Sequence, residues 1–95
     1  MRHELKTHPA MFRAVRDGVK NFEVRKDDRA FQAGDTVVLN FYEPPPNAPT
    51  FAAPPAAYDP SDNRDPIAKT ISFVLRGGQY GVEAGHVVLA LKDME

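Results

Sequence analysis

Residues 44–66 hold eight of the nine prolines in the chain, together with five alanines. Proline has no backbone N–H to donate within a sheet, and it pushes the residue before it toward extended conformations. This segment therefore cannot form an interior strand, and we expect a long exposed loop that is disordered or mobile. The sequences on either side of it must share one core. A length of 95 residues suits a single domain, so we expect residues 1–95 to form one.

Hydrophobic patterns outside the loop predict several short strands and one helix. We expect a helix over residues 9–17, which Pro9 begins and Gly18 ends. The alternating or β-branched stretches predict strands at residues 2–8, 20–26, 36–42, 69–76 and 86–92. This order lacks the regular alternation of helix and strand found in doubly wound folds. We expect an α+β, mostly β fold, a small mixed or antiparallel barrel of about five strands with the N-terminal helix packed on it.

The strand at residues 20–26 has two contrasting faces. Phe22 and Val24 alternate with Glu23 and Arg25. We expect the two apolar side chains to face the core and the two charged ones to face the other side. Phe31, in the loop that follows, is expected to anchor that loop to the core.

Composition limits the possible environments and cofactors. The chain has no cysteine, which excludes disulfides and thiolate metal sites. It has no apolar run long enough to cross a membrane, and its first residues are charged, so we expect a cytoplasmic protein without membrane contact. The scattered His3, His8 and His86 do not have the spacing of metal ligands. No phosphate-binding loop or nucleophile motif occurs, and we expect neither metal nor cofactor.

Charge is unevenly distributed along the chain. The formal net charge is −1, but residues 1–42 carry eight basic against six acidic side chains. This surplus is much smaller than that of proteins that bind nucleic acid nonspecifically through many phosphates. Any nucleic-acid or nucleotide site must therefore be local and specific.

One motif within the basic half is recognisable. Residues 18–25 read GVKNFEVR, which has the form G-x-K-x-x-E-x-R and resembles the signature of ASCH domains in the PUA-like superfamily. HELK at 3–6, the GD at 34–35 and QYGVEAGHVVLALK at 79–92 are similar to a compact branch of uncharacterised phage and bacterial proteins. The resemblance covers nearly all of the chain except residues 44–66. It implies a PUA-like barrel whose cleft, beside the first helix and second strand, accepts RNA, a nucleotide or a modified base.

The same resemblance implies a possible enzymatic activity. Some ASCH relatives are amidohydrolases that remove an acyl group from a modified cytidine nucleoside. They use a lysine at the place of Lys20, a threonine at the place of Glu23 and a separate downstream carboxylate. This chain has a glutamate in place of that threonine and so lacks the hydroxyl, which leaves open whether it catalyses a reaction.

Lys20, Glu23 and Arg25 are the principal candidate site residues. Arginine can bind a phosphate or a base edge through two parallel hydrogen bonds, and lysine supplies a point charge. Glutamate can accept a hydrogen bond from an exocyclic amine or act as a base. The alternative is a solvated ion cluster of small energetic value. If Arg25 serves only a ligand, Arg25→Ala should leave the melting temperature nearly unchanged.

Four further residues are secondary candidates for ligand binding: Arg29, Lys6, His3 and Tyr80. Arg29 can reach the cleft or pair with the aspartates beside it. His3 can bind a ligand or fill a structural position. Tyr80 can stack on a base or pack against the core.

Three functions are consistent with these features. The first is a module that binds RNA, a nucleotide or a modified nucleoside in a single cleft. The second is a small hydrolase that acts on an acylated nucleoside or RNA, with Lys20 and Glu23 as the acid/base pair. The third is a phage accessory protein that binds a host protein, through the loop at residues 44–66. No pattern requires an oligomer, and a monomer is the default expectation.

Overall fold

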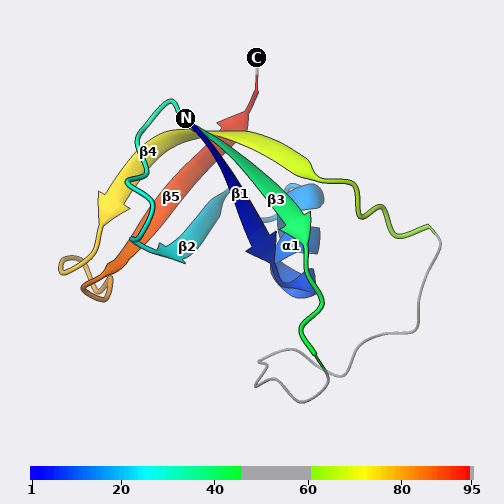
Figure 1. Cartoon of the computed structure of the whole chain (residues 1–95), viewed down its shortest axis with the longest axis horizontal. Coiled ribbons are helices and arrows are strands. Elements are labelled where there is room, and N and C mark those ends of the chain that lie inside the picture. Colours follow the sequence, from blue (N-terminus) through cyan, green and yellow to red (C-terminus); the bar gives the residue numbers. More distant parts are fainter. Residues whose placement is uncertain (46–60, 95) are drawn as a thin grey trace.

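The computed structural model describes residues 1–45 and 61–94, in which five strands form one curved sheet (Figure 1). The elements are β1 (Arg2–Thr7), α1 (Pro9–Arg16), β2 (Phe22–Lys26), β3 (Thr36–Phe41), β4 (Ile67–Arg76) and β5 (His86–Asp93). Their order in the sheet is β1-β3-β4-β5-β2. The β1–β3 pairing is parallel, and the other three pairings are antiparallel. This curled half-barrel with one short helix confirms the predicted mostly β fold.

The predicted loop at 44–66, and the partner-binding role considered for it, fall mainly on residues 46–60, which lie outside the described residues. Its final part, from residue 61, is described and contacts α1. In the described ranges 1–45 and 61–94, no helix is long and apolar enough to cross a membrane.

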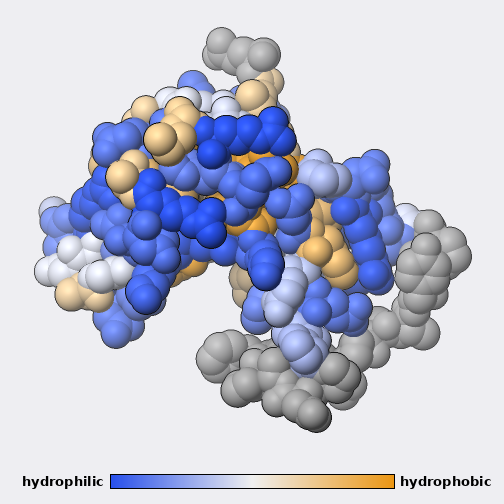
Figure 2. All heavy atoms as spheres, in the orientation of Figure 1, coloured by the Kyte–Doolittle hydropathy of each residue, from blue (hydrophilic) through white to orange (hydrophobic). Residues whose placement is uncertain are grey.

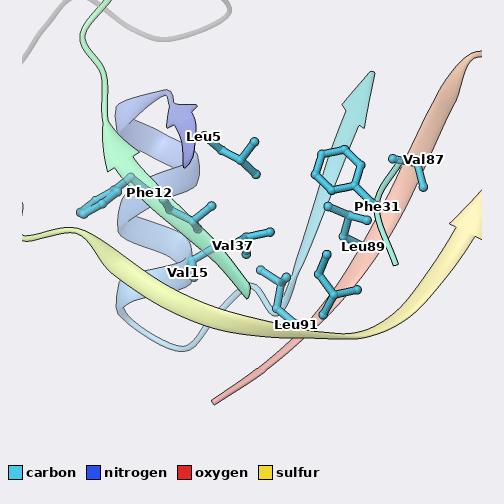
Figure 3. Packing of buried hydrophobic residues seen from close by; sticks show 10 residues of the cluster. Leu5, Phe12, Val15, Phe31, Val37, Val87, Leu89 and Leu91 are labelled. Carbon is cyan, nitrogen blue, oxygen red and sulfur yellow. The ribbon is translucent and has the colours of Figure 1, made fainter. Parts of the chain in front are cut away.

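The core fills the concave side of the sheet, where α1 packs beside β3 (Figure 3). Phe12 and Val15 are the buried residues of the helix, and Phe31 is buried as predicted. Each such side chain stabilises the fold by about 1.5–3 kcal/mol when fully buried. The buried cluster consists of Leu5, Phe12, Val15, Phe31, Val37, Leu39, Ile71, Val87, Leu89 and Leu91.

The predicted alternation along β2 is correct, but its two faces are reversed. Glu23 is 3% exposed, whereas Phe22 is 41% and Val24 is 54% exposed. The pairing with β5 explains this, because Glu23 lies opposite Leu89, which is fully buried. Residues directly opposite each other on paired strands share a face of the sheet. The prediction that Phe22 and Val24 face the core is therefore wrong, and β2 turns Glu23 and Arg25 inward while Lys26 is exposed.

Candidate functional site: a basic groove between the two sheet edges

The structure brings Lys20, Glu23 and Arg25 together. The chain leaves α1 through Gly18, whose φ of +76° suits glycine, and Lys20 follows just before β2. Lys20 Nζ lies 3.2 Å from Glu23 Oε1, and Arg25 Nε lies 3.6 Å from Glu23 Oε2. The side chain of Glu23 is thus a buried carboxylate between two cations.

Two atoms of this cluster are buried without a hydrogen bond. Among the described residues, Glu23 Oε1 and Arg25 Nε find no partner within hydrogen-bonding geometry. Most buried polar atoms in proteins are hydrogen-bonded, and an unsatisfied one costs about 1–3 kcal/mol. Burial lowers the pKa of the Arg25 guanidinium, against the opposing effect of Glu23, and Arg29 lowers it further. Both atoms lie within the ion pairs of the cluster, so Lys20, Glu23 and Arg25 interact mainly with one another.

Arg25 also joins the two edges of the sheet. Strands β1 and β2 are the terminal strands of the sheet and do not pair with each other. Arg25 Nη1 donates to the carbonyl oxygen of Lys6 at 2.8 Å, and its Nη2 donates to Thr7 Oγ1 at 3.0 Å. Arg29 Nη1 donates to the carbonyl oxygen of Glu4 at 2.7 Å. The two arginines close the gap through side chains, so Arg25 has structural contacts and we no longer expect Arg25→Ala to leave the melting temperature nearly unchanged.

A groove of about 590 Å³ opens beside this closure. Its volume falls in the range typical of small-molecule sites. Lys6 Nζ lies 5.1 Å from the centre of the half-buried Tyr42 ring, so a cation and an aromatic face lie side by side. The groove is lined by Glu4, Lys6, Arg25, Arg29, Asn40, Phe41 and Tyr42. Three basic residues against one acidic residue make it suitable for an anionic ligand.

A smaller hollow of about 240 Å³ lies on the other side of the cluster. It is lined by Val15, Gly18, Lys20, Asn21, Lys69, Leu91, Lys92 and Asp93, and Lys69 forms an ion pair with Asp93. Lys20 therefore lines the smaller hollow and Arg25 lines the groove, and Glu23 lies between these two residues. Of the three residues predicted to share a single cleft, Lys20 and Arg25 thus line different hollows, and the buried Glu23 lines neither.

The secondary candidates divide into two groups. Lys6 and Arg29 line the groove with Arg25, and Arg29 is also near Asp28, with 3.9 Å between Arg29 Nε and Asp28 Oδ1. His3 is buried elsewhere and packs against the Phe31 ring, with 4.7 Å between ring centres. Tyr80 is 85% exposed in the β4–β5 connection and lines neither hollow, so it does not join the other candidates at the groove and does not pack against the core.

His3 belongs to a polar cluster around Asp35. His3 Nε2 lies 2.9 Å from Asp35 Oδ2, and the Met1 amino group lies 3.0 Å from Asp35 Oδ1. These contacts, with a hydrogen bond from the Gln32 backbone N–H, lower the pKa of Asp35 to about 2. Within residues 1–45 and 61–94, no group of three or more His, Cys, Asp or Glu side chains could hold a metal ion.

The groove also contains residues that the sequence did not single out, namely Glu4, Asn40, Phe41 and Tyr42. They meet Lys6 because β1 and β3 pair in parallel, which places Lys6 opposite Asn40. The parallel pairing itself has no local sequence signal, since the paired strands are separated by α1 and β2.

The segment that follows the undescribed residues is attached to α1 next to the groove. Asp62 accepts hydrogen bonds from Arg13 Nη2 at 2.8 Å and from Arg16, which holds the pKa of this carboxyl well below its usual range. Arg64 is also bonded to Asp62, and its guanidinium lies 4.3 Å from the centre of the Phe41 ring. These contacts place the end of the proline-rich segment over a residue of the groove wall.

Residues 2–91 match the family described as "Domain of unknown function (DUF3850)". The chain belongs to this family. A curated relative, the "Uncharacterized 12.9 kDa protein in GpA 3'region" of Escherichia phage P2, is 45% identical over 38 residues. That match covers 40% of this chain and 35% of the relative's length. The predicted similarity to uncharacterised phage proteins is thus confirmed.

Proposed function

We propose that this chain is an ASCH-like module of the PUA-like type that binds RNA, a nucleotide or a modified nucleoside in the groove between β1 and β2. The observation that carries the proposal is a groove in which three basic residues, Lys6, Arg25 and Arg29, lie beside the half-buried ring of Tyr42. Guanidinium groups bind phosphate through short, charge-assisted hydrogen bonds. An aromatic ring beside them provides a stacking surface for a base.

Each groove residue has a distinct part in this binding. Arg29 and Lys6 are the more exposed cations and are available to a phosphate. Tyr42 offers its ring to the base. Arg25 forms the floor of the groove, and the buried Glu23 carboxylate fixes its orientation from behind. Lys20 neutralises Glu23 from the other side, so the whole triad acts mainly by positioning Arg25.

Binding of the four ribonucleoside 5′-monophosphates, of acylated cytidines and of short RNAs, measured by calorimetry, tests the proposal. We expect Arg29→Ala to weaken binding by about tenfold or more, because a hydrogen bond to a charged group contributes about 1.5–3 kcal/mol. The matched control is Arg2→Ala, since Arg2 lies on β1, is exposed and is outside the groove lining. Equal affinities of the two variants, or no binding of any of these ligands by the wild type, would contradict the proposal.

A second candidate function is hydrolysis of an acyl group from a modified nucleoside or of RNA. The 3.2 Å separation of Lys20 Nζ and Glu23 Oε1, both little exposed, favours it, because such a pair can relay a proton. Incubation with a panel of acylated cytidines and with RNA should then release product. Lys20→Ala and Glu23→Gln should each abolish this release while Arg2→Ala retains it. Absence of any product from the wild-type protein would exclude the second candidate and leave the first unaffected.

A further inference from the structure

The reversed faces of β2 place apolar side chains on the outer surface of the sheet. Phe22 and Phe73 lie opposite Ala90 from its two sides, and in the next row Val24 and Leu75 lie opposite Val88. Phe22, Val24 and Phe73 are among the exposed large apolar residues of the described chain. We call this set the outer apolar face, consisting of Phe22, Val24, Phe73, Leu75, Val88 and Ala90. It is on the opposite side of the sheet from Glu23 and Arg25.

A bulge in β4 turns Phe73 outward. The register with β5 shifts between Ile71 and Phe73, so Ser72 is an extra residue. Ile71 is fully buried, and regular alternation would return Phe73 to the same buried side. Instead, Phe73 is opposite Ala90 and is 61% exposed. Bulges are found where a side chain is re-aimed, often beside functional sites.

The outer apolar face has cationic residues at both ends. Lys26, which is paired with His86, lies at one end, and Lys92, which is opposite Thr70, lies at the other. Lys20 Nζ also lies 4.9 Å from the centre of the Phe22 ring. If a second copy of the chain docked its own outer apolar face on this one, the lysines at the ends of the two faces would meet, whether the strands of the two copies ran parallel or antiparallel. The charge pattern therefore disfavours a homodimer and favours an anionic partner.

The spacing of the two aromatic residues fits a planar ring. Phe22 and Phe73 are on strands separated by one intervening strand, which places their backbones about 10 Å apart. Ring–ring contacts have centre distances of about 4.5–7 Å, so one further ring fits between the two. The small Ala90 side chain, opposite both, leaves room at the base of this gap.

We propose that the outer apolar face is a second site, which binds single-stranded nucleic acid. One base stacks over Ala90 between Phe22 and Phe73, and the flanking phosphates contact Lys26 and Lys92. Strand-borne aromatic residues with basic neighbours bind single strands in this way, with little dependence on sequence. In the view of Figure 2, hydrophobic side chains form small areas of a surface that is otherwise largely hydrophilic.

The test is fluorescence anisotropy of a labelled uridylate dodecamer RNA with the full chain at low salt. Loss of one stacking contact is expected to weaken binding about 5- to 100-fold, so Phe73→Ala and Phe22→Ala should each do so. Lys26→Ala should lower the slope of affinity against salt by about one phosphate contact. The matched control is Val19→Ala, because Val19 is 84% exposed and outside this face. Unchanged circular dichroism establishes that the variants fold.

Three results would overturn the second site. One is equal RNA affinity of the Phe73→Ala, Phe22→Ala and wild-type proteins. Another is a dimer of the wild-type protein in analytical ultracentrifugation that becomes a monomer in Phe73→Ala. That result would identify the face as an interface between two copies of the chain. The third is binding to phosphatidylserine vesicles, but not RNA, that depends on Phe73. Mononucleotide binding in the groove should be insensitive to Phe73→Ala and sensitive to Arg29→Ala, so failure of one site is distinguishable from failure of the other.

Discussion

Arg25→Ala should destabilise the protein because it opens the side-chain closure between the sheet edges. The variant loses two charge-assisted hydrogen bonds to β1, from Nη1 to the Lys6 carbonyl oxygen and from Nη2 to Thr7 Oγ1. It also leaves the buried Glu23 carboxylate with Lys20 as its remaining cation. Hydrogen bonds to charged groups contribute about 1.5–3 kcal/mol each, and water replaces part of this at a half-buried position. We expect a loss of about 2–4 kcal/mol in the free energy of unfolding.

For a domain of this size, such a loss corresponds to a fall in Tm of about 10–25 °C. Urea unfolding followed by circular dichroism measures it, with Arg2→Ala as the matched control. Arg2 is exposed and forms a long ion pair with Glu4 at 3.6 Å, which predicts a change within about 0.5 kcal/mol. Amide exchange should accelerate in β1 of Arg25→Ala before it does elsewhere. Equal unfolding free energies for the two variants would refute the closure.

Three further perturbations test other contacts of the fold. Asp35→Asn should lower Tm at neutral pH and reduce the fall of Tm between about pH 4 and pH 2. The reason is that a carboxyl whose pKa is about 2 in the folded state stabilises the fold above its unfolded pKa and loses this effect as the pH falls. Thermal melts of both proteins across this pH range measure the difference. Gly77→Ala should prevent or strongly impair folding, since its Cβ would lie 2.0 and 2.6 Å from backbone oxygens of the facing segment; Gly34→Ala, strained by φ of +94° but not crowded, should lower Tm less. Asp62→Ala should raise amide exchange over residues 61–66 more than Asp65→Ala does, because Asp62 carries the contacts to α1.

Sequence patterns were sufficient to predict the elements of the fold. The strand at residues 36–42, β-branched and aromatic, and the helix between Pro9 and Gly18 agree with the observed bounds within a residue or two. Local propensity, together with the proline and glycine that begin and end the helix, determines these features, so short stretches of sequence are enough to predict them. The inward side of β2 could not be read this way. Hydrophobicity favours Phe22 and Val24 inside, but pairing with β5 places Glu23 there, where Lys20 and Arg25 compensate its charge.

The composition of the site shows the same limit. The motif spacing correctly brought Lys20, Glu23 and Arg25 together, because Lys20 comes just before β2 and Glu23 and Arg25 alternate along the same face of that strand. The groove wall formed by Asn40 and Tyr42 depends on the parallel pairing of β1 with β3, which is a contact between distant parts of the chain. Side-chain closure by Arg25 depends on the curvature of the whole sheet, which no single segment encodes.

Amide chemical-shift mapping with the ribonucleoside 5′-monophosphates tests the central claim most directly. The proposed groove predicts saturable shifts at Lys6, Arg25, Arg29 and Tyr42, with no shift at Phe73 on the outer face. These shifts should weaken in Arg29→Ala and persist in Arg2→Ala. A titration in which none of the four groove residues responds, or in which the shifts lie entirely elsewhere, would contradict nucleotide binding in this groove.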